Sequence, residues 1–385
     1  MKKAILMLLM YLYLFNFSVS AQQRDRTSLT NADTITNFSA FKRSLGFAGV
    51  LQTRYVASLN KDVDVNGKNF DPSAAKGITN TFLVKRARFM VKANINDHFS
   101  ANILVNFADF NSDPTNKVLE NAYIKYSLNN HFNVMAGQFR PFFGIEDAIA
   151  VDIIRTLDFS NQYYAFGKNG WQSFQIGLSV LGDITNDGKL RYFAGAYNGN
   201  NRTQPTDDNN TKNFYARLEA DVVKDFTVAV NGGTGSLGAS ATGNAWGADA
   251  TANISMSQKW KLLLMAEYKQ GSNFLAYNSS TLVPKPGISQ FRMQGFYFFP
   301  TFRYEYKRPR VRAMEFSCRY ELFDENYKLN SNVRQTLIPN ISLIFADNFY
   351  AALQVGVSID LFKHDVPLSA NYTGQLAYAQ LQIRL

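Results

Sequence analysis

Basic and apolar side chains alternate in one early segment of the chain. Arg86, Arg88 and Lys92 share one parity of sequence position, while Phe89 and Val91 share the other. Side chains two apart in an extended strand point to the same side, so this segment would carry a positive face and an apolar face. Fixed cations attract anions, and arginine adds a planar fork that fits phosphate or carboxylate. Such a row could line a water-filled path for anions, which needs an electric field and weak binding but no nucleophile.

The same parity argument extends the set of inward-facing cations along the chain. Together with Arg140 and Lys168 from the stretch 140–170, the strand residues predict an anion path lined by Arg54, Arg86, Arg88, Lys92, Arg140, Lys168, Arg191, Arg217, Arg303, Arg319 and Arg334. Parity also points carboxylates inward at Glu219, Glu267, Glu305, Glu315, Glu321 and Asp360. Two interpretations of each arginine therefore stay open, because an inward arginine can lie on a permeation path or can pair with a carboxylate and stiffen a wall.

Residues 140–170 form the longest early stretch that lacks strand periodicity. Its charged residues are Arg140, Glu146, Asp147, Asp152, Arg155, Asp158 and Lys168. Tyr163, Tyr164 and Phe166 lie among them. Segments of this length without regular structure tend to be functional. We expect a loop that narrows a lumen, with charges toward the pore and rings against the wall; the alternative is a lid packed over the mouth.

The elements that would position these residues are about sixteen strand-like segments of roughly ten residues each. Gaps between the segments alternate in length, from tight turns at 96–98 and 129–131 to long polar stretches at 59–80 and 269–290. This rhythm is typical of a closed up-and-down antiparallel β-barrel in an outer membrane. We therefore predict an all-β transmembrane barrel over 44–385, with short periplasmic turns and long extracellular loops.

The N-terminal residues indicate export. Lys2 and Lys3 precede an apolar run that is followed by small residues ending at Ala21. This order is that of a signal peptide, and the run is shorter than the ~20 apolar residues of a spanning helix. We expect a signal peptide at 1–21, a polar periplasmic segment at 22–43, and localisation in the outer membrane of a bacterial cell.

The composition excludes several classes of protein. No stretch of about 18 apolar residues follows the signal, which excludes a helical membrane protein. One cysteine, Cys318, cannot form an internal disulfide, and only three histidines are present. We expect no enzyme, no metal and no other cofactor, since His98 and His131 fall in predicted turns. The net charge of +10 is explained by a basic lumen, so we expect no nucleic-acid partner.

Three segments resemble those of a known family, the phosphate-selective porins O and P. The segments are 85–93, 119–126 and the Gly-Gln-Phe-Arg-Pro-Phe-Phe-Gly-Ile-Glu run at 137–146. The resemblance implies a sixteen-stranded outer-membrane porin, a homotrimer, and a third loop folded into the lumen. Where the family often has Gly-Arg-Asp, this chain has Gly167-Lys168-Asn169, which keeps the basic charge and loses the acidic one.

The expected function is passive diffusion of small hydrophilic solutes, with a preference for anions such as phosphate. The expected partners are outer-membrane lipid, small anionic or polar solutes, two further copies of the chain, and the barrel assembly machinery that reads a final strand. The alternative is a surface β-protein that acts as a glycan-binding module or as an adhesin through its long loops.

Overall fold

The computed structural model describes most of the chain after its first residues. The described residues are 34–38, 43–74, 76–111, 118–148, 155–200, 206–238, 241–306, 308–347 and 350–385. The expected signal peptide, most of the segment 22–43, and Asp152 lie outside these ranges. Cleavage after Ala21 therefore stays a prediction.

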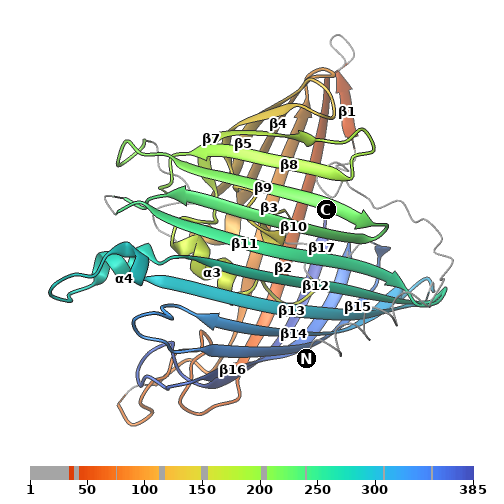
Figure 1. The fold of residues 1–385 in the computed structure, drawn as a ribbon. Helices are drawn as coiled ribbons and strands as arrows, with labels where there is room; N and C mark the ends of the chain where they lie inside the picture. Colours follow the sequence, from red (N-terminus) through yellow and green to blue (C-terminus); the bar gives the residue numbers. More distant parts are fainter. Residues whose placement is uncertain are drawn as a thin grey trace, which may run out of the picture.

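Within these ranges, sixteen strands form one closed antiparallel ring (Figure 1). Strands β2 to β17 pair in sequence order, and β17 pairs back onto β2, which closes the sheet. The first half comprises β2 (Arg43–Ser58), β3 (Asn80–Asn94), β4 (Phe99–Asn106), β5 (Leu119–Ser127), β6 (Asn133–Phe139), β7 (Gln175–Asp183), β8 (Leu190–Tyr197) and β9 (Asn213–Val223). The second comprises β10 (Phe226–Gly235), β11 (Gly243–Ser255), β12 (Trp260–Ser272), β13 (Arg292–Glu305), β14 (Ala313–Asp324), β15 (Arg334–Ile344), β16 (Ala351–Phe362) and β17 (Gly374–Arg384). The predicted sixteen-stranded barrel is confirmed.

The connections alternate in length around the ring, as the sequence predicts. Residues 95–98 and 224–225 are short turns at one end, whereas 140–174 and 273–291 are long connections at the other. The connection 273–291 extends to the left in Figure 1, where α4 (Phe274–Ser279) marks it, whereas α3 (Asn161–Lys168) of the connection 140–174 lies within the ring. The loop lengths in the sequence thus indicate which strand ends lie at the short-turn end of the barrel and which lie at the long-connection end.

A few shorter elements accompany the barrel. Strand β1 (Thr34–Phe38) pairs with the start of β2, and η1 (Phe107–Asn111) follows β4. Within 140–174 lie α2 (Ile145–Ala148) and α3 (Asn161–Lys168), and η3 (Ile288–Gln290) precedes β13. Among the described residues, no helix has the length and apolar content to cross a membrane.

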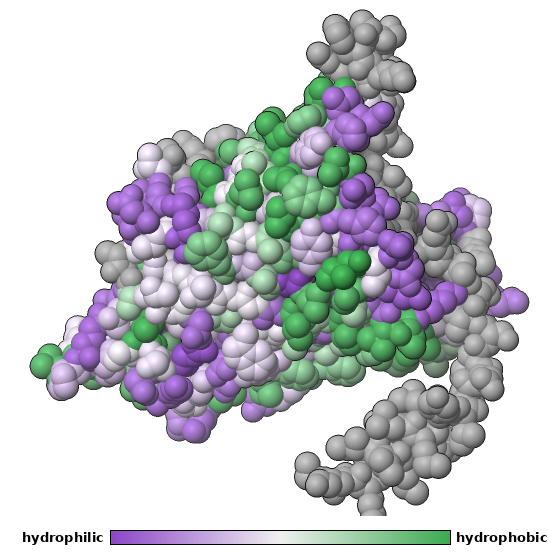
Figure 2. Space-filling model, turned by 45° about the horizontal axis from the view of Figure 1, so that its top comes forward, coloured by the Kyte–Doolittle hydropathy of each residue, from purple (hydrophilic) through white to green (hydrophobic). Residues whose placement is uncertain are grey.

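The outer face of the barrel is apolar. Phe82, Ile124 and Phe298 are well exposed, as expected of side chains that would meet lipid rather than water. Figure 2 shows hydrophobic and weakly polar residues over much of the visible wall, with hydrophilic residues gathered mainly toward its ends. The charged side chains discussed below lie on the opposite, inner face.

A β-bulge changes the inward and outward assignment in β3. Gln52 pairs with Arg86, but its neighbour Thr53 pairs with Val84, so Lys85 has no partner on β2. An extra residue of this kind reverses the parity beyond it. A strict period of two would place Leu83 beside Phe89 on the outer face, which is wrong, because the bulge makes Leu83 the partner of the inward Arg54.

The largest apolar cluster lies inside the ring, where a hollow barrel would hold water. Phe143, Phe166 and Trp171 of the 140–174 connection are fully buried there against Tyr197 and Tyr215 of the wall. Burying each such ring contributes about 1.5–3 kcal/mol. Trp171 is part of this cluster and β7 begins at Gln175, so the segment without strand structure extends past the expected limit at residue 170.

Candidate functional site in the barrel lumen

We call residues 140–174 the lumen loop, because its described residues are bonded to the inner wall on several sides. Arg319 of β14 donates to the carbonyl oxygens of Asp158 and Phe159 at 2.6 and 3.0 Å. Arg54 of β2 donates to the carbonyl oxygen of Leu157, and Gln354 of β16 to that of Thr156. Residues 156–159 therefore form a strap along the wall from β14 to β2.

Helix α3 is held against the adjoining wall and contacts β13 and β14. Ser160 begins the helix, with its Oγ accepting from the Tyr163 amide. The Asn161 amide donates to Glu321 at 2.7 Å, so a wall carboxylate satisfies a free amide of the first turn. Lys168, expected on the anion path, lies exposed at the far end of this helix.

The start of the lumen loop is held by a buried carboxylate on β12. Glu267 accepts from the Ile145 amide at 3.0 Å and forms an ion pair with Lys269 at 2.9 Å. Gly144 has a φ of +128°, and a Cβ built there would lie 1.9 Å from Glu267 Oε1. A glycine is required at this position both by its backbone conformation and by the approach of the wall.

Two loop carboxyls beside this anchor have raised pKa values. Burial raises the pKa of Glu146 to about 7, although Arg319 opposes the shift. Glu146 accepts hydrogen bonds from the amide and the hydroxyl of Ser160. Burial likewise raises the pKa of Asp147 to about 6, against the attraction of Lys269. Both carboxyls therefore change charge near neutral pH.

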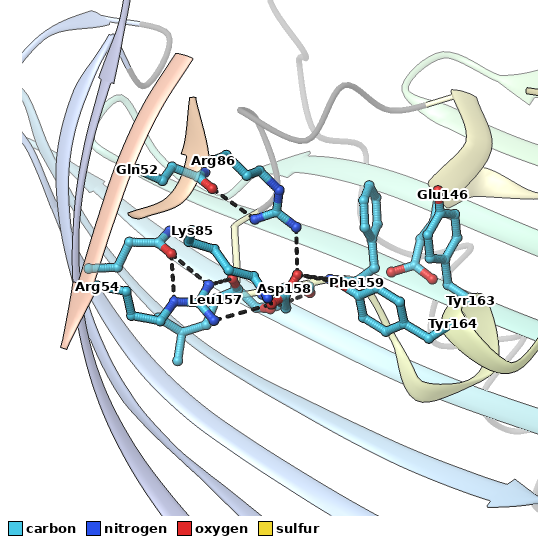
Figure 3. A network of polar contacts seen from close by, with 12 residues as sticks. Gln52, Arg54, Lys85, Arg86, Glu146, Leu157, Asp158, Phe159, Tyr163 and Tyr164 are labelled. Carbon is cyan, nitrogen blue, oxygen red and sulfur yellow. Dashed lines mark hydrogen bonds and ion pairs between the residues drawn. The ribbon is translucent and has the colours of Figure 1, made fainter. Parts of the chain in front are cut away.

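Three cations converge on Asp158 of the strap, and we call this group the Asp158 cluster (Figure 3). The carboxylate contacts Arg86 at 2.7 Å, Lys85 at 3.1 Å and Arg54 at 3.2 Å. Tyr164 also donates its hydroxyl to it. Burial favours the neutral acid, but Arg86, Lys85 and Arg54 outweigh it and hold the pKa of Asp158 well below its usual range.

The neighbouring wall, β3 to β5, carries further cations on its inner face. Arg88 pairs with Glu120 of β5 at 2.6 Å. Lys92 and Lys125 are half-buried and lie nearer the short turns, with Lys92 opposite Asn102 and Lys125 opposite Ser100. We call Lys85, Arg86, Arg88, Lys92 and Lys125 the basic wall.

The remaining predicted arginines on the wall are paired with carboxylates. The pairs are Arg191 with Glu219 and Asp221, Arg217 with Asp249 and Glu219, Arg303 with Glu305 and Glu315, Arg319 with Glu321, and Arg334 with Asp360. These contacts favour the wall-stiffening interpretation for β8 to β16, since paired charges add little net field.

The other predicted loop cations are also engaged. Arg140 donates at 3.0 Å to the Tyr163 hydroxyl and to the Glu146 carbonyl, and it lies over the Phe159 ring. Arg155 pairs with Glu315 of β14. The structure therefore brings Arg54, Arg86 and Asp158 together, while it places Arg140 and Arg155 at separate attachments of the loop.

Sequence reasoning missed Lys85 and Glu120 as inward-facing residues. Each lies at a register shift, where one strand has an extra residue relative to its partner. A period of two assigns both to the lipid face. The charges themselves were a usable signal, because an isolated charge in a lipid-facing row is costly and suggests a bulge.

The fold and the lumen define an outer-membrane β-barrel of the porin type. Residues 57–222 match the family model described as phosphate-selective porin O and P, which confirms the resemblance seen in the sequence. No curated protein matches the chain.

Solved structures share the fold at low sequence identity. The outer-membrane channel DcaP of Acinetobacter baumannii has 14% identity, covers 89% of this chain and 97% of its own, and gives a TM-score of 0.56. OmpF of Salmonella typhi, solved in complex with daunomycin, has 9% identity, coverages of 89% and 98%, and a TM-score of 0.58. OmpT of Vibrio cholerae has 10% identity, coverages of 89% and 98%, and a TM-score of 0.53. At these identities the likeness shows the fold alone.

Proposed function

We propose that this protein is an outer-membrane porin through which small hydrophilic solutes diffuse, with a preference for anions such as phosphate. The family match supports a channel rather than an enzyme. The central observation is the basic wall, which places five cations on β3 to β5; among the described residues, Lys85 and Arg86 contact Asp158 of the loop and Arg88 contacts Glu120.

The contacts of the lumen loop support the position of the path. Its hydrogen bonds to the wall reach β2, β3 and β12 to β16. These contacts hold the loop against β12 to β16, and the strap crosses to β2 and β3, where Asp158 contacts Arg54, Lys85 and Arg86. We infer that solutes pass beside the strap along the basic wall, where the concentration of basic side chains favours anions.

Strand length supports the proposed homotrimer. Strand β4 has eight residues and would rise roughly 20 Å when tilted, less than the ~25 Å apolar band of such barrels. Strand β11 has thirteen residues and spans the band with margin. A short wall is better covered by protein than by lipid, and one related structure of Vibrio cholerae OmpT is described as a trimer form.

Reconstitution into planar lipid bilayers tests the channel. We expect stepwise conductance increases from the purified mature protein, residues 22–385, together with swelling of liposomes in small polar solutes. Bilayers that stay silent while the protein binds glycans or host surfaces would support the adhesin instead.

A further inference from the structure

The cations of the Asp158 cluster differ in how firmly each is held. Arg54 also donates to Gln380 at 2.6 and 2.9 Å and to the Leu157 carbonyl. Arg86 also donates to Gln52 at 2.8 Å. Their side chains are 5% and 7% exposed, so both guanidinium groups are fixed parts of the wall.

Lys85 is the accessible member of the cluster. Its side chain is 33% exposed, and among the described residues its contact is the carboxylate of Asp158. Asp158 is itself 21% exposed. Three cations around one carboxylate leave two positive charges in excess (Figure 3), and Lys85 and Asp158 are more exposed than the two arginines.

We propose that Lys85 and Asp158 form an exchangeable ion pair, at which a small, multiply charged oxyanion replaces Asp158 as the partner of the Lys85 ammonium. Asp158 remains bonded to Arg54, Arg86 and Tyr164 during the exchange, so the strap does not detach. The inference rests on the proposed function and assigns a specificity-determining residue within it.

Competition between the two anions explains how such a site could conduct. A lysine without a partner would hold a divalent anion tightly and slow its release, whereas a channel site must bind weakly enough to let go. The tethered carboxylate returns to Lys85 as the solute leaves. The ammonium of lysine is compact and rotates freely, so Lys85 can exchange one anionic partner for another more easily than a fixed guanidinium fork could.

Block of the chloride current by inorganic phosphate tests the exchange in planar bilayers. Lys85→Gln should raise the half-blocking phosphate concentration about fivefold, and Asp158→Asn should lower it about fivefold, as one partly exposed ionic contact predicts. Lys85→Arg should stay within about twofold of wild type because it keeps the charge. Lys189→Gln removes a comparable lysine–aspartate pair in the turn 184–189 and should change nothing.

The double variant Lys85→Gln/Asp158→Asn measures the coupling. If the two groups exchange partners, Asp158→Asn should shift the block by less than about twofold once Lys85 is absent. An equal fivefold shift in both backgrounds, or an unchanged block in Lys85→Gln, overturns the inference while the channel remains anion-selective.

A wild-type channel that prefers potassium overturns the proposed function and the inference together. Heat-modifiable migration on gels confirms that each variant is folded. If Asp158→Asn does not assemble, the phosphate block of Lys85→Gln compared with Lys85→Arg tests the inference.

Discussion

At the scale of single residues, the role of an arginine inside this barrel depends on the partner of its side chain as well as on the direction in which it points. Arg217 and Arg334 point inward as parity predicts, yet Arg217 is paired with Asp249 of β11 and Arg334 with Asp360 of β16. Lys92 and Lys125 belong to a wall with few carboxylates. Counting inward arginines therefore overstates the length of the anion path, and the balance of charge along each part of the wall is the better guide.

The Arg88–Glu120 pair should contribute to stability mainly because each charge compensates the other in a buried position. Arg88→Gln removes the ion pair of Glu120, whose side chain is 3% exposed, and should lower the free energy of unfolding by about 3–5 kcal/mol. Replacing both residues by Gln should cost less than either single change. The unfolding temperature in detergent, read from heat-modifiable migration, measures each variant; a double variant that is less stable than both singles would contradict this explanation.

The raised pKa values of Glu146 and Asp147 predict a pH dependence of the loop anchor. The folded state binds protons more tightly than the unfolded chain, so stability is fully present at acidic pH and decreases as pH rises through about 6 to 7. Between pH 5.5 and pH 8 the free energy of unfolding should decrease by about 2–3 kcal/mol. Thermal unfolding in detergent at pH 5.5 and pH 8 measures it. Glu146→Gln should flatten the dependence, and an unchanged slope would assign it to other groups.

At the scale of elements, the lumen loop is shaped as much by the wall as by its own sequence. Ser160 begins α3 by an ordinary capping contact, which a local pattern can reveal. The strap 156–159 has no such pattern, because its carbonyl oxygens are bonded by arginines more than a hundred residues away. Only the closed ring brings those donors to the loop.

Gly144 offers a direct test of this attachment. Gly144→Ala would place a methyl group against Glu267 and Lys269 in a backbone conformation that disfavours it, so the loop start should move off β12. We expect a larger or noisier single-channel conductance. Gly67→Ala is the matched control, since Gly67 also has a positive φ of +77° but no atom within 4 Å of the built Cβ. Equal effects of the two changes would show that backbone strain alone is responsible.

The strands could be predicted from the sequence, and much of the lumen could not. Alternation and loop length fix sixteen strands within a few residues, because each signal is local. Lys85 and Glu120 escape that reasoning, since a bulge is visible only when two strands are paired. Asp158 was expected in the loop, but its three cations come from two strands whose arrangement depends on ring closure.

At the scale of the whole molecule, the barrel has a short wall and a long wall. If the short wall is the interface of a homotrimer, Ile124→Arg on the outer face of β5 should dissociate the assembly and leave the barrel folded. Phe316→Arg, on the outer face of β14, should cost stability as a charge in lipid and leave the trimer intact. Native mass spectrometry in detergent distinguishes these results; a monomeric wild type would contradict the interface.

The central claim is that the basic wall makes the lumen favour anions. The most direct measurement is the reversal potential of single channels in a tenfold gradient of potassium chloride at neutral pH. We predict a potential with the sign of chloride selectivity, reduced when Lys92 and Lys125 are both changed to Gln. A potential with the sign of potassium selectivity would contradict the proposed path, while the barrel itself would stand.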